Sequence, residues 1–242
     1  MKKRILAVLL LCLLLTGCGY VTVRTESTPM PAPVAAPSPT PTPVPVATPM
    51  SMPEPTPTPM PTPTPEVPDE TLVNVKDYIP SVFVDLRYAT TNNFTGQVIY
   101  DFTTAQLRYG TVKKLSAAAD ALARQGYALL IWDACRPASA QFHLWEVCPN
   151  IIYVANPYNG YSKHSRGNTV DITLVTLDGG EVEMPSGFDE FSALADRDYS
   201  DVSEAAAMHA NLLEQAMTEA GFIPYAGEWW HYSDSVQYEV VQ

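Results

Sequence analysis

The chain of 242 residues has few basic residues: 14 Lys and Arg stand against 26 Asp and Glu, which gives a formal net charge of −12 at pH 7. Nucleic acids and anionic lipid surfaces are bound through basic patches, so neither is expected as a partner. Solubility is a sufficient explanation for most of the acidity. The charge therefore excludes classes of partner rather than indicating one.

Long hydrophobic runs are also lacking, apart from residues 5–15, which follow a short basic segment. A run of this length is typical of a signal-peptide core rather than of a membrane span. The sequence LTGC, ending at Cys18, resembles a bacterial lipobox, in which the cysteine is diacylated after cleavage; an ordinary secretory signal is the alternative. We therefore expect a lipoprotein signal peptide over 1–18 and an extracytoplasmic protein. Its contact with the cell membrane of a bacterium would be through the lipid anchor at Cys18 only.

Aromatic residues are missing from 28–68, where 17 of 41 residues are proline. Such a segment cannot bury enough apolar surface to offset the entropy lost on ordering. At about 3.1 Å per residue in a polyproline conformation, it would reach on the order of 100 Å. We expect residues 19–70 to be a disordered Pro/Thr-rich tether and residues 71–242 to form one folded domain.

Cysteine is scarce as well, with four in the chain. Cys12 lies in the expected signal peptide and Cys18 is expected to carry lipid, so Cys135 and Cys148 remain. A remaining pair in an exported domain favours a disulfide, worth roughly 3 kcal/mol for a loop of about 14 residues; two buried thiols are the alternative. No CxxC pair is present, so a metal ion would need histidine and carboxylate ligands.

The apolar patterns of the domain predict helices and strands in mixed order. A helix is expected over 102–125, where Thr103 and Gln106 fit a capping box and Gly126 follows as a stop signal. The other expected elements are helices over 138–147 and 203–220, and strands over 127–133, over 169–177, after the turn at 178–180, and at the aromatic sequence EWWHY. Together they indicate an α+β fold, with a small, mainly antiparallel sheet flanked by helices.

One polar segment, SKHSRGNTVDITL, places His164 and Asp171 seven positions apart with Gly167 between them. The alternation of the strand that follows directs its aliphatic side chains to the core and Asp171 to the opposite face. The turn at Gly167 would allow His164 to fold back beside Asp171. Because two ligands rarely hold zinc, a further histidine is needed.

Among His143, His209 and His231, His231 is the strongest candidate for a third ligand; the alternative is that the segment around His164 is a surface loop without a metal. His209 lies among alanines of a helix and is expected at the surface, and His143 is expected to be structural. His231 follows Glu228 by three residues in an aromatic setting, and zinc-dependent hydrolysis needs a carboxylate base beside the metal. Residues three apart lie on opposite faces of a regular strand, so a turn or bulge near Gly227 is required.

These residues resemble a known family. The pattern SxHxxGxxxD from Ser162 to Asp171, with ExWH from Glu228 to His231, resembles the signature of LAS-type zinc peptidases of the D-alanyl-D-alanine group. DLRYATTNNFTG and WDACRP, further upstream, are similar to segments of VanX-type D-Ala-D-Ala dipeptidases rather than of VanY-type carboxypeptidases. The resemblance covers residues 72–235, and it implies the LAS-type zinc peptidase fold.

The resemblance also implies a role for individual residues. One zinc ion (Zn2+) per domain would be held by three ligands: His164, Asp171 and His231. Glu228 would be the catalytic base, and Arg136 would stabilise the oxyanion that develops in the reaction. The residues that would bind the two ends of a dipeptide are Tyr88, Ser162 and Asp189. Asp133 is expected to position the neighbouring chain rather than to perform chemistry.

The predicted function is zinc-dependent hydrolysis of D-alanyl-D-alanine to two D-alanine at the cell surface. One alternative is a D,D-carboxypeptidase that trims terminal D-Ala from peptidoglycan stem peptides. The other is a non-catalytic, zinc-containing binding lipoprotein, which Glu228 and Arg136 disfavour because binding alone requires neither. The segment between Arg136 and His164 is shorter than in typical members, so the choice between free dipeptide and peptidoglycan-derived peptides stays open.

Overall fold

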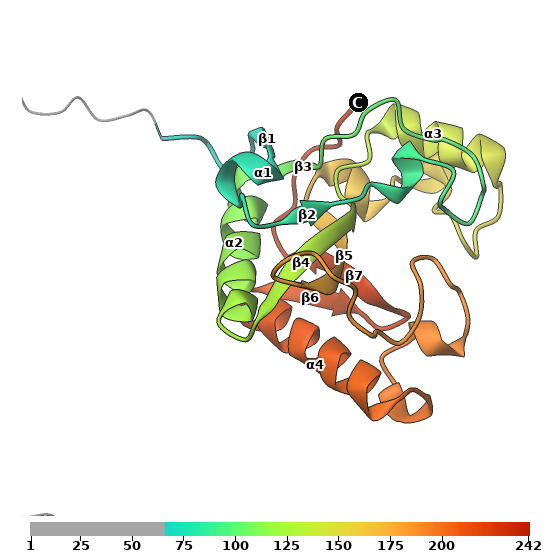
Figure 1. Cartoon of the computed structure of the whole chain (residues 1–242). Helices are drawn as coiled ribbons and strands as arrows, with labels where there is room; N and C mark the ends of the chain where they lie inside the picture. Colours follow the sequence, from blue (N-terminus) through green and yellow to red (C-terminus); the bar gives the residue numbers. More distant parts are fainter. Residues whose placement is uncertain (1–65) are drawn as a thin grey trace, which may run out of the picture. The chain divides into compact units, whose positions relative to one another are not determined.

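The computed structural model describes residues 66–242 (Figure 1). The expected signal peptide, the lipidation of Cys18 and the expected tether up to residue 65 lie outside the described residues. Within 66–242, none of the helices has both the length and the apolar character needed to cross a membrane.

A five-stranded sheet forms the centre of the domain, with the strand order β2-β4-β5-β7-β6. Its strands are β2 (Phe83–Val84), β4 (Tyr127–Asp133), β5 (Thr169–Thr176), β6 (Phe222–Tyr225) and β7 (Glu228–Asp234). Only β2 and β4 run parallel; the other neighbours in this sheet are antiparallel. A separate antiparallel ribbon joins β1 (Leu72–Asn74) to β3 (Gln106–Arg108).

The helices lie around this sheet, which confirms the α+β fold (Figure 1). The α-helices are α1 (Val75–Tyr78), α2 (Tyr109–Ala123), α3 (Ala138–Val147) and α4 (Glu204–Glu219). Short 3-10 turns connect them: η1 (Arg87–Ala89), η2 (Pro157–Asn159), η3 (Lys163–Arg166), η4 (Ala193–Ala195) and η5 (Tyr199–Asp201). Helices α2 and α4 pack against each other and against the sheet, whereas α3 lies at the other end of the domain, near the C-terminus.

Strand β5 is buried on both faces, although one of its faces carries polar side chains. Val170, Ile172 and Leu174 point into the apolar core, as the alternation predicts. Asp171 and Thr173, on the opposite face, are only 4% exposed, because loops cover that face too. A buried carboxylate requires partners, so the covered face is where a site is to be sought.

Two predicted elements differ in the structure. The helix expected from residue 102 begins at Tyr109, because Gln106 pairs with Asn74 in the β1–β3 ribbon. The capping box of Thr103 and Gln106 is therefore wrong, and its cause is a pairing with a strand more than thirty residues away. After the turn at 178–180, the expected strand is reduced to one isolated bridge between Val175 and Glu181.

The expected disulfide is not formed: Cys135 and Cys148 are both free thiols. Cys148 directly follows α3, and Arg136, Pro137 and the ten residues of that helix separate it from Cys135. Ten helical residues span about 15 Å, whereas a disulfide needs Cα atoms within about 7 Å. Burial raises the pKa of the Cys135 thiol to about 12, which makes it unreactive.

Candidate active site

Asp171 and His231 are brought together by the register of the sheet. The two residues are direct partners across the antiparallel pair of β5 and β7. Oδ1 of Asp171 lies 3.0 Å from Nδ1 of His231. Burial lowers the pKa of His231 below its usual value, which favours the neutral imidazole that binds metal ions.

His164 reaches the same point from the turn η3. The hydroxyl of Ser162 accepts a hydrogen bond from the His164 amide, and Gly167 ends the turn in the left-handed conformation (φ +71). The Nδ1 of His164 lies 2.8 Å from the carbonyl oxygen of Ala134, so Nδ1 donates there and Nε2 carries the free lone pair. That Nε2 lies 3.3 Å from Oδ2 of Asp171 and 3.4 Å from Nδ1 of His231.

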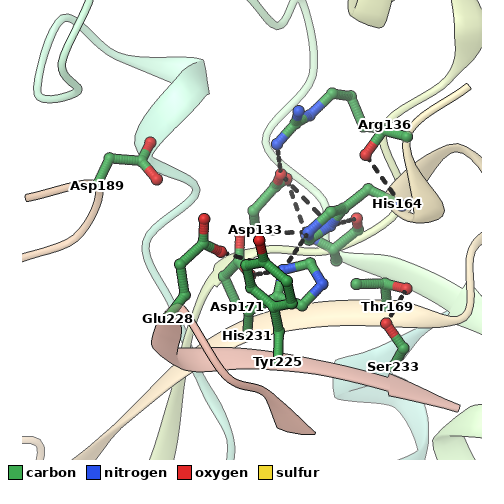
Figure 2. Close-up of polar contacts among 12 residues, drawn as sticks. Asp133, Arg136, His164, Thr169, Asp171, Asp189, Tyr225, Glu228, His231 and Ser233 are labelled. Atoms are coloured by element: carbon green, nitrogen blue, oxygen red, sulfur yellow. Dashed lines mark hydrogen bonds and ion pairs between the residues drawn. The ribbon is translucent and has the colours of Figure 1, made fainter. Parts of the chain in front are cut away.

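The three side chains fit a zinc ion. Their ligand atoms all lie within 4.8 Å of one another (Figure 2). Oδ1 of Asp171 is buried, yet no donor of acceptable geometry reaches it in the described part of the chain. A buried carboxylate oxygen is rarely left so, and a cation between the three groups would satisfy it. Two imidazoles and one carboxylate are a donor set of catalytic zinc sites, which keep a further position open.

Glu228 lies on the same side as His231 because a bulge interrupts β7. Tyr232 pairs with Pro224, but Glu228 pairs with the next residue, Tyr225, so three residues of β7 have no counterpart. This is the irregularity that the spacing of Glu228 and His231 requires. Oε2 of Glu228 lies 3.5 Å from Nδ1 of His231, and burial, followed by the charge of Asp171, raises the pKa of Glu228 to about 7.

Arg136 is held in place by three side chains. It donates to the Tyr100 hydroxyl from Nε at 3.1 Å, to Oε1 of Gln141 from Nη1 at 3.1 Å, and to Oδ2 of Asp133 from Nη2. Asp133 in turn accepts hydrogen bonds from Tyr100 and from the Ala134 amide, so it positions its neighbours, as expected. Within residues 66–242, two of the five N–H groups of Arg136 have no partner and are available to a ligand.

Asp189 lies on the side of the metal site where Glu228 lies (Figure 2), and it is hydrogen-bonded to Tyr88. The Tyr88 hydroxyl donates to Oδ2 of Asp189 at 2.6 Å, and the Tyr88 ring lies 4.8 Å from the Arg136 guanidinium carbon. Burial raises the pKa of Asp189 well above its usual value. The backbone of Asp189 has φ +53, a strained conformation that a non-glycine residue rarely adopts without cause.

A cavity of about 600 Å³ lies beside this pair and includes Asp189 in its wall. It follows the same face of the sheet as Asp171, over Trp132 and Thr173, and the loops after β2 and β5 close its sides. Arg87 and Glu181 both line the cavity, and Nε of Arg87 is paired with Oδ2 of Asp85 at 3.2 Å. The space next to Asp189 is therefore larger than a small side chain would fill.

Comparisons with known proteins agree with this geometry. A family model described as D-ala-D-ala dipeptidase, Peptidase_M15, matches residues 69–240. This chain belongs to the M15 peptidase family.

Three relatives carry the name D-alanyl-D-alanine dipeptidase. The protein of Escherichia coli K12 is 35% identical over 161 residues, which cover 66% of this chain and 83% of the relative. That of Enterococcus faecium is 34% identical over 168 residues (61% and 83%), and that of Streptomyces coelicolor is 34% identical over 180 residues (66% and 89%). A crystal structure of a mutant of the vancomycin resistance D,D-pentapeptidase VanY in complex with Zn(II) resembles the chain weakly. It is 15% identical, covers 57% of this chain and 76% of that one, and has a TM-score of 0.37.

The two remaining histidines of this M15 chain take no part in the metal cluster. His143 is exposed on α3, where Glu146 lies 3.9 Å away. His209 is less exposed than expected: it is half-buried, with Nε2 3.1 Å from the Tyr127 hydroxyl and Nδ1 2.9 Å from the Glu183 carbonyl. Each of these two histidines contacts residues other than the three metal ligands.

Sequence reasoning missed Tyr100 and Gln141, which hold Arg136. Gln141 lies five residues after Arg136 on the first turns of α3, a spacing that could have indicated the contact. Tyr100 is 36 residues upstream in an irregular segment, and no local pattern marks it. Ser162 was expected to bind substrate, but in the structure its hydroxyl accepts from the backbone of the turn that carries His164. Its role toward the dipeptide stays a prediction.

Proposed function

We propose that this M15 peptidase hydrolyses D-alanyl-D-alanine to two D-alanine with one zinc ion. The proposal rests on one observation: the side chains of His164, Asp171 and His231 converge on one point, and Oε2 of Glu228 lies 3.5 Å from Nδ1 of His231. A binding protein with a structural metal would need neither a buried base nor an arginine with free donors. Hydrolysis uses both.

The residues of the chain divide the chemistry between them. When bound, zinc polarises a peptide carbonyl and makes a water molecule more acidic. Glu228 takes the proton from the attacking water and then delivers it to the departing amine. A base with a pKa near neutrality suits both transfers, and burial raises the pKa of Glu228 to about 7.

Arg136 stabilises the charge that develops on the former carbonyl oxygen. Its guanidinium is fixed by Asp133, Tyr100 and Gln141, so little reorganisation is needed during the reaction. Two of its N–H groups remain available for the oxyanion. Arg136 cannot act as the proton donor, because arginine stays protonated in proteins.

Asp189 binds the ammonium group of a free dipeptide. A buried carboxylate that has one hydroxyl donor, Tyr88, still has oxygen lone pairs for a cation. A substrate ammonium beside Asp189 would favour the ionised carboxylate and so lower the pKa that burial raises. Peptides whose amino group is acylated lack this charge, which supports selection of free dipeptides.

A D,D-carboxypeptidase that acts on peptidoglycan stem peptides is the second candidate. The observation that favours it is the cavity of about 600 Å³ beside Asp189, where the N-terminal part of a longer peptide could lie.

We further propose that the enzyme works outside the cell membrane, tethered through Cys18. The hydrophobic run, the lipobox-like LTGC and the proline-rich segment support this location. A tethered enzyme would act on dipeptide released during wall turnover, or scavenge it for uptake. Cell fractionation of a strain that makes the full chain, compared with a Cys18→Ser variant, tests the anchor: loss of membrane attachment in the variant supports it, and unchanged attachment contradicts it.

The activity is tested by measuring D-Ala released from D-Ala-D-Ala and from a pentapeptide that ends in D-Ala-D-Ala. Glu228→Ala is the control, because it removes the base while leaving the three ligands. Cleavage of the dipeptide alone, lost in the control, supports the first candidate. Release from the pentapeptide supports the second, and zinc binding without cleavage of either contradicts both.

A further inference from the structure

At the bulge in β7, the pairing between β6 and β7 is interrupted. Between Tyr232 and Glu228, three residues of β7 face no partner in β6, so the regular exchange of hydrogen bonds stops there. Glu228 and His231 are the two ends of this irregular stretch. His231 is held by its pairing with Asp171 of β5, whereas Glu228 has no partner in β5. The position of Glu228 relative to His231 therefore needs support beyond strand pairing.

Arg197 supplies that support through backbone carbonyls. Its Nη2 donates to the carbonyl oxygens of Glu228 at 3.1 Å and His231 at 3.2 Å, and its Nε donates to that of Tyr225 at 2.8 Å. One guanidinium therefore joins both ends of the bulge to the last residue of β6. Each of the three bonds ends on main chain, so the contact fixes backbone and not a side-chain rotamer.

The other side of Arg197 is anchored to α4 and to aromatic residues. Its Nη1 donates to Oε2 of Glu214 at 2.9 Å and lies within hydrogen-bond distance of the hydroxyls of Tyr199 and Tyr232. The guanidinium carbon lies 4.7 Å from the centre of the Tyr232 ring. The side chain is 11% exposed.

These contacts use every donor of the guanidinium. Nε and Nη2 account for three N–H groups, and the acceptors around Nη1 account for the other two. No N–H of Arg197 is left for a substrate. Arg197 therefore differs from Arg136, which has free donors, and it has no part in binding the dipeptide.

We propose that Arg197 is a positioning residue that holds the bulge of β7, and thereby sets the place of Glu228 relative to the zinc ligand His231. The proposal rests on the function proposed above. The planar fork of arginine can reach three carbonyls in fixed directions, whereas the single ammonium of lysine cannot. Arg197→Lys should therefore keep the charge next to Glu214 but release part of the bulge.

The test compares full-length wild type, Arg197→Lys and Arg124→Lys, the last a matched control at an exposed arginine of the α2 C-terminus. Zinc affinity is measured by competition with a chromophoric chelator, well below the unfolding temperature. We expect Arg197→Lys to bind zinc about tenfold more weakly, as when groups that orient metal ligands are lost. At saturating zinc, kcat on D-Ala-D-Ala should fall roughly 10- to 100-fold with KM little changed. Arg124→Lys should match wild type in both.

The outcomes separate this proposal from the function on which it rests. Wild type that binds no zinc or releases no D-Ala contradicts the proposed function. A folded Arg197→Lys with the zinc affinity and kcat of wild type contradicts the positioning role, even if its melting temperature falls. If Arg197→Lys does not fold, Glu214→Gln weakens the anchor of the same guanidinium. That variant should show a smaller loss of zinc affinity of the same kind, and unchanged affinity would overturn the proposal.

Discussion

Asp171 and His231 lie directly opposite each other on neighbouring antiparallel strands, with 3.0 Å between Oδ1 and Nδ1. Two of the three metal ligands are thus placed by strand register, and a slip of one residue would send one of them to the other face. The third, His164, comes from a turn whose backbone is capped by Ser162. The site is built from the central sheet and one short turn attached to it.

Replacing Arg136 by lysine should lower kcat and leave KM nearly unchanged, because the guanidinium is assigned to the oxyanion of the transition state. The loss expected for one such donor group is roughly 100- to 1,000-fold in kcat. Steady-state kinetics on D-Ala-D-Ala, with Arg124→Lys as control, measures it. An increase in KM at constant kcat would show instead that Arg136 binds the ground state.

Replacing Asp189 by asparagine should raise KM for the free dipeptide roughly 10- to 100-fold, because a charge-assisted contact to the ammonium is lost. An N-acetylated dipeptide, which has no ammonium, should be affected much less. Comparing the two substrates on wild type and Asp189→Asn isolates this contact. Equal losses on both substrates would contradict the ammonium role.

The rate should fall as the pH is lowered through the region below neutrality. Burial and the charge of Asp171 raise the pKa of Glu228 to about 7, and a general base works only when deprotonated. Activity that depends on Glu228 is therefore present above this pKa and lost below it. The positive charge of zinc favours the carboxylate, so the midpoint in kcat/KM should lie at or below pH 7. A rate that increases as the pH falls would contradict Glu228 as the base.

Deleting Val241 and Gln242 should destabilise the turn that carries His164. The Val241 amide donates to the Ser165 carbonyl at 2.7 Å, and the Val241 carbonyl accepts from the Ala138 amide at 2.8 Å. Losing two backbone hydrogen bonds should lower the free energy of unfolding by about 1–3 kcal/mol. Urea denaturation measures this, and deleting Gln242 alone is the matched control. Equal stability of the two deletions would show that the bonds contribute nothing.

The fold was predictable where a local apolar pattern decides the element. Strands β4, β5 and β7 and helices α3 and α4 lie where the sequence predicts them, since each has its own continuous or periodic apolar residues. The start of α2 was not predictable locally, because Gln106 is drawn into a ribbon with Asn74. Pairings between distant segments leave no trace in a short window of sequence.

The same distinction holds for the site. The spacing of His164 and Asp171, and the aromatic setting of His231, indicated a candidate cluster, and the family resemblance implied that the three are zinc ligands. The structure brings them together. The supporting residues could not be predicted, because Tyr100 contacts a residue 36 positions away and Arg197 reaches the His231 carbonyl across 34 positions. Their contacts join residues that are distant in the sequence, so they can be recognised only once the fold is known.

The proposed activity requires zinc at His164, Asp171 and His231. Zinc is therefore added stepwise to the metal-free full chain while the release of D-Ala from D-Ala-D-Ala is followed. We predict that activity rises linearly and levels off at one zinc per chain, and that Asp171→Ala binds zinc far more weakly. Full activity of the metal-free chain, or unchanged zinc affinity in Asp171→Ala, would contradict a catalytic zinc ion at these three residues.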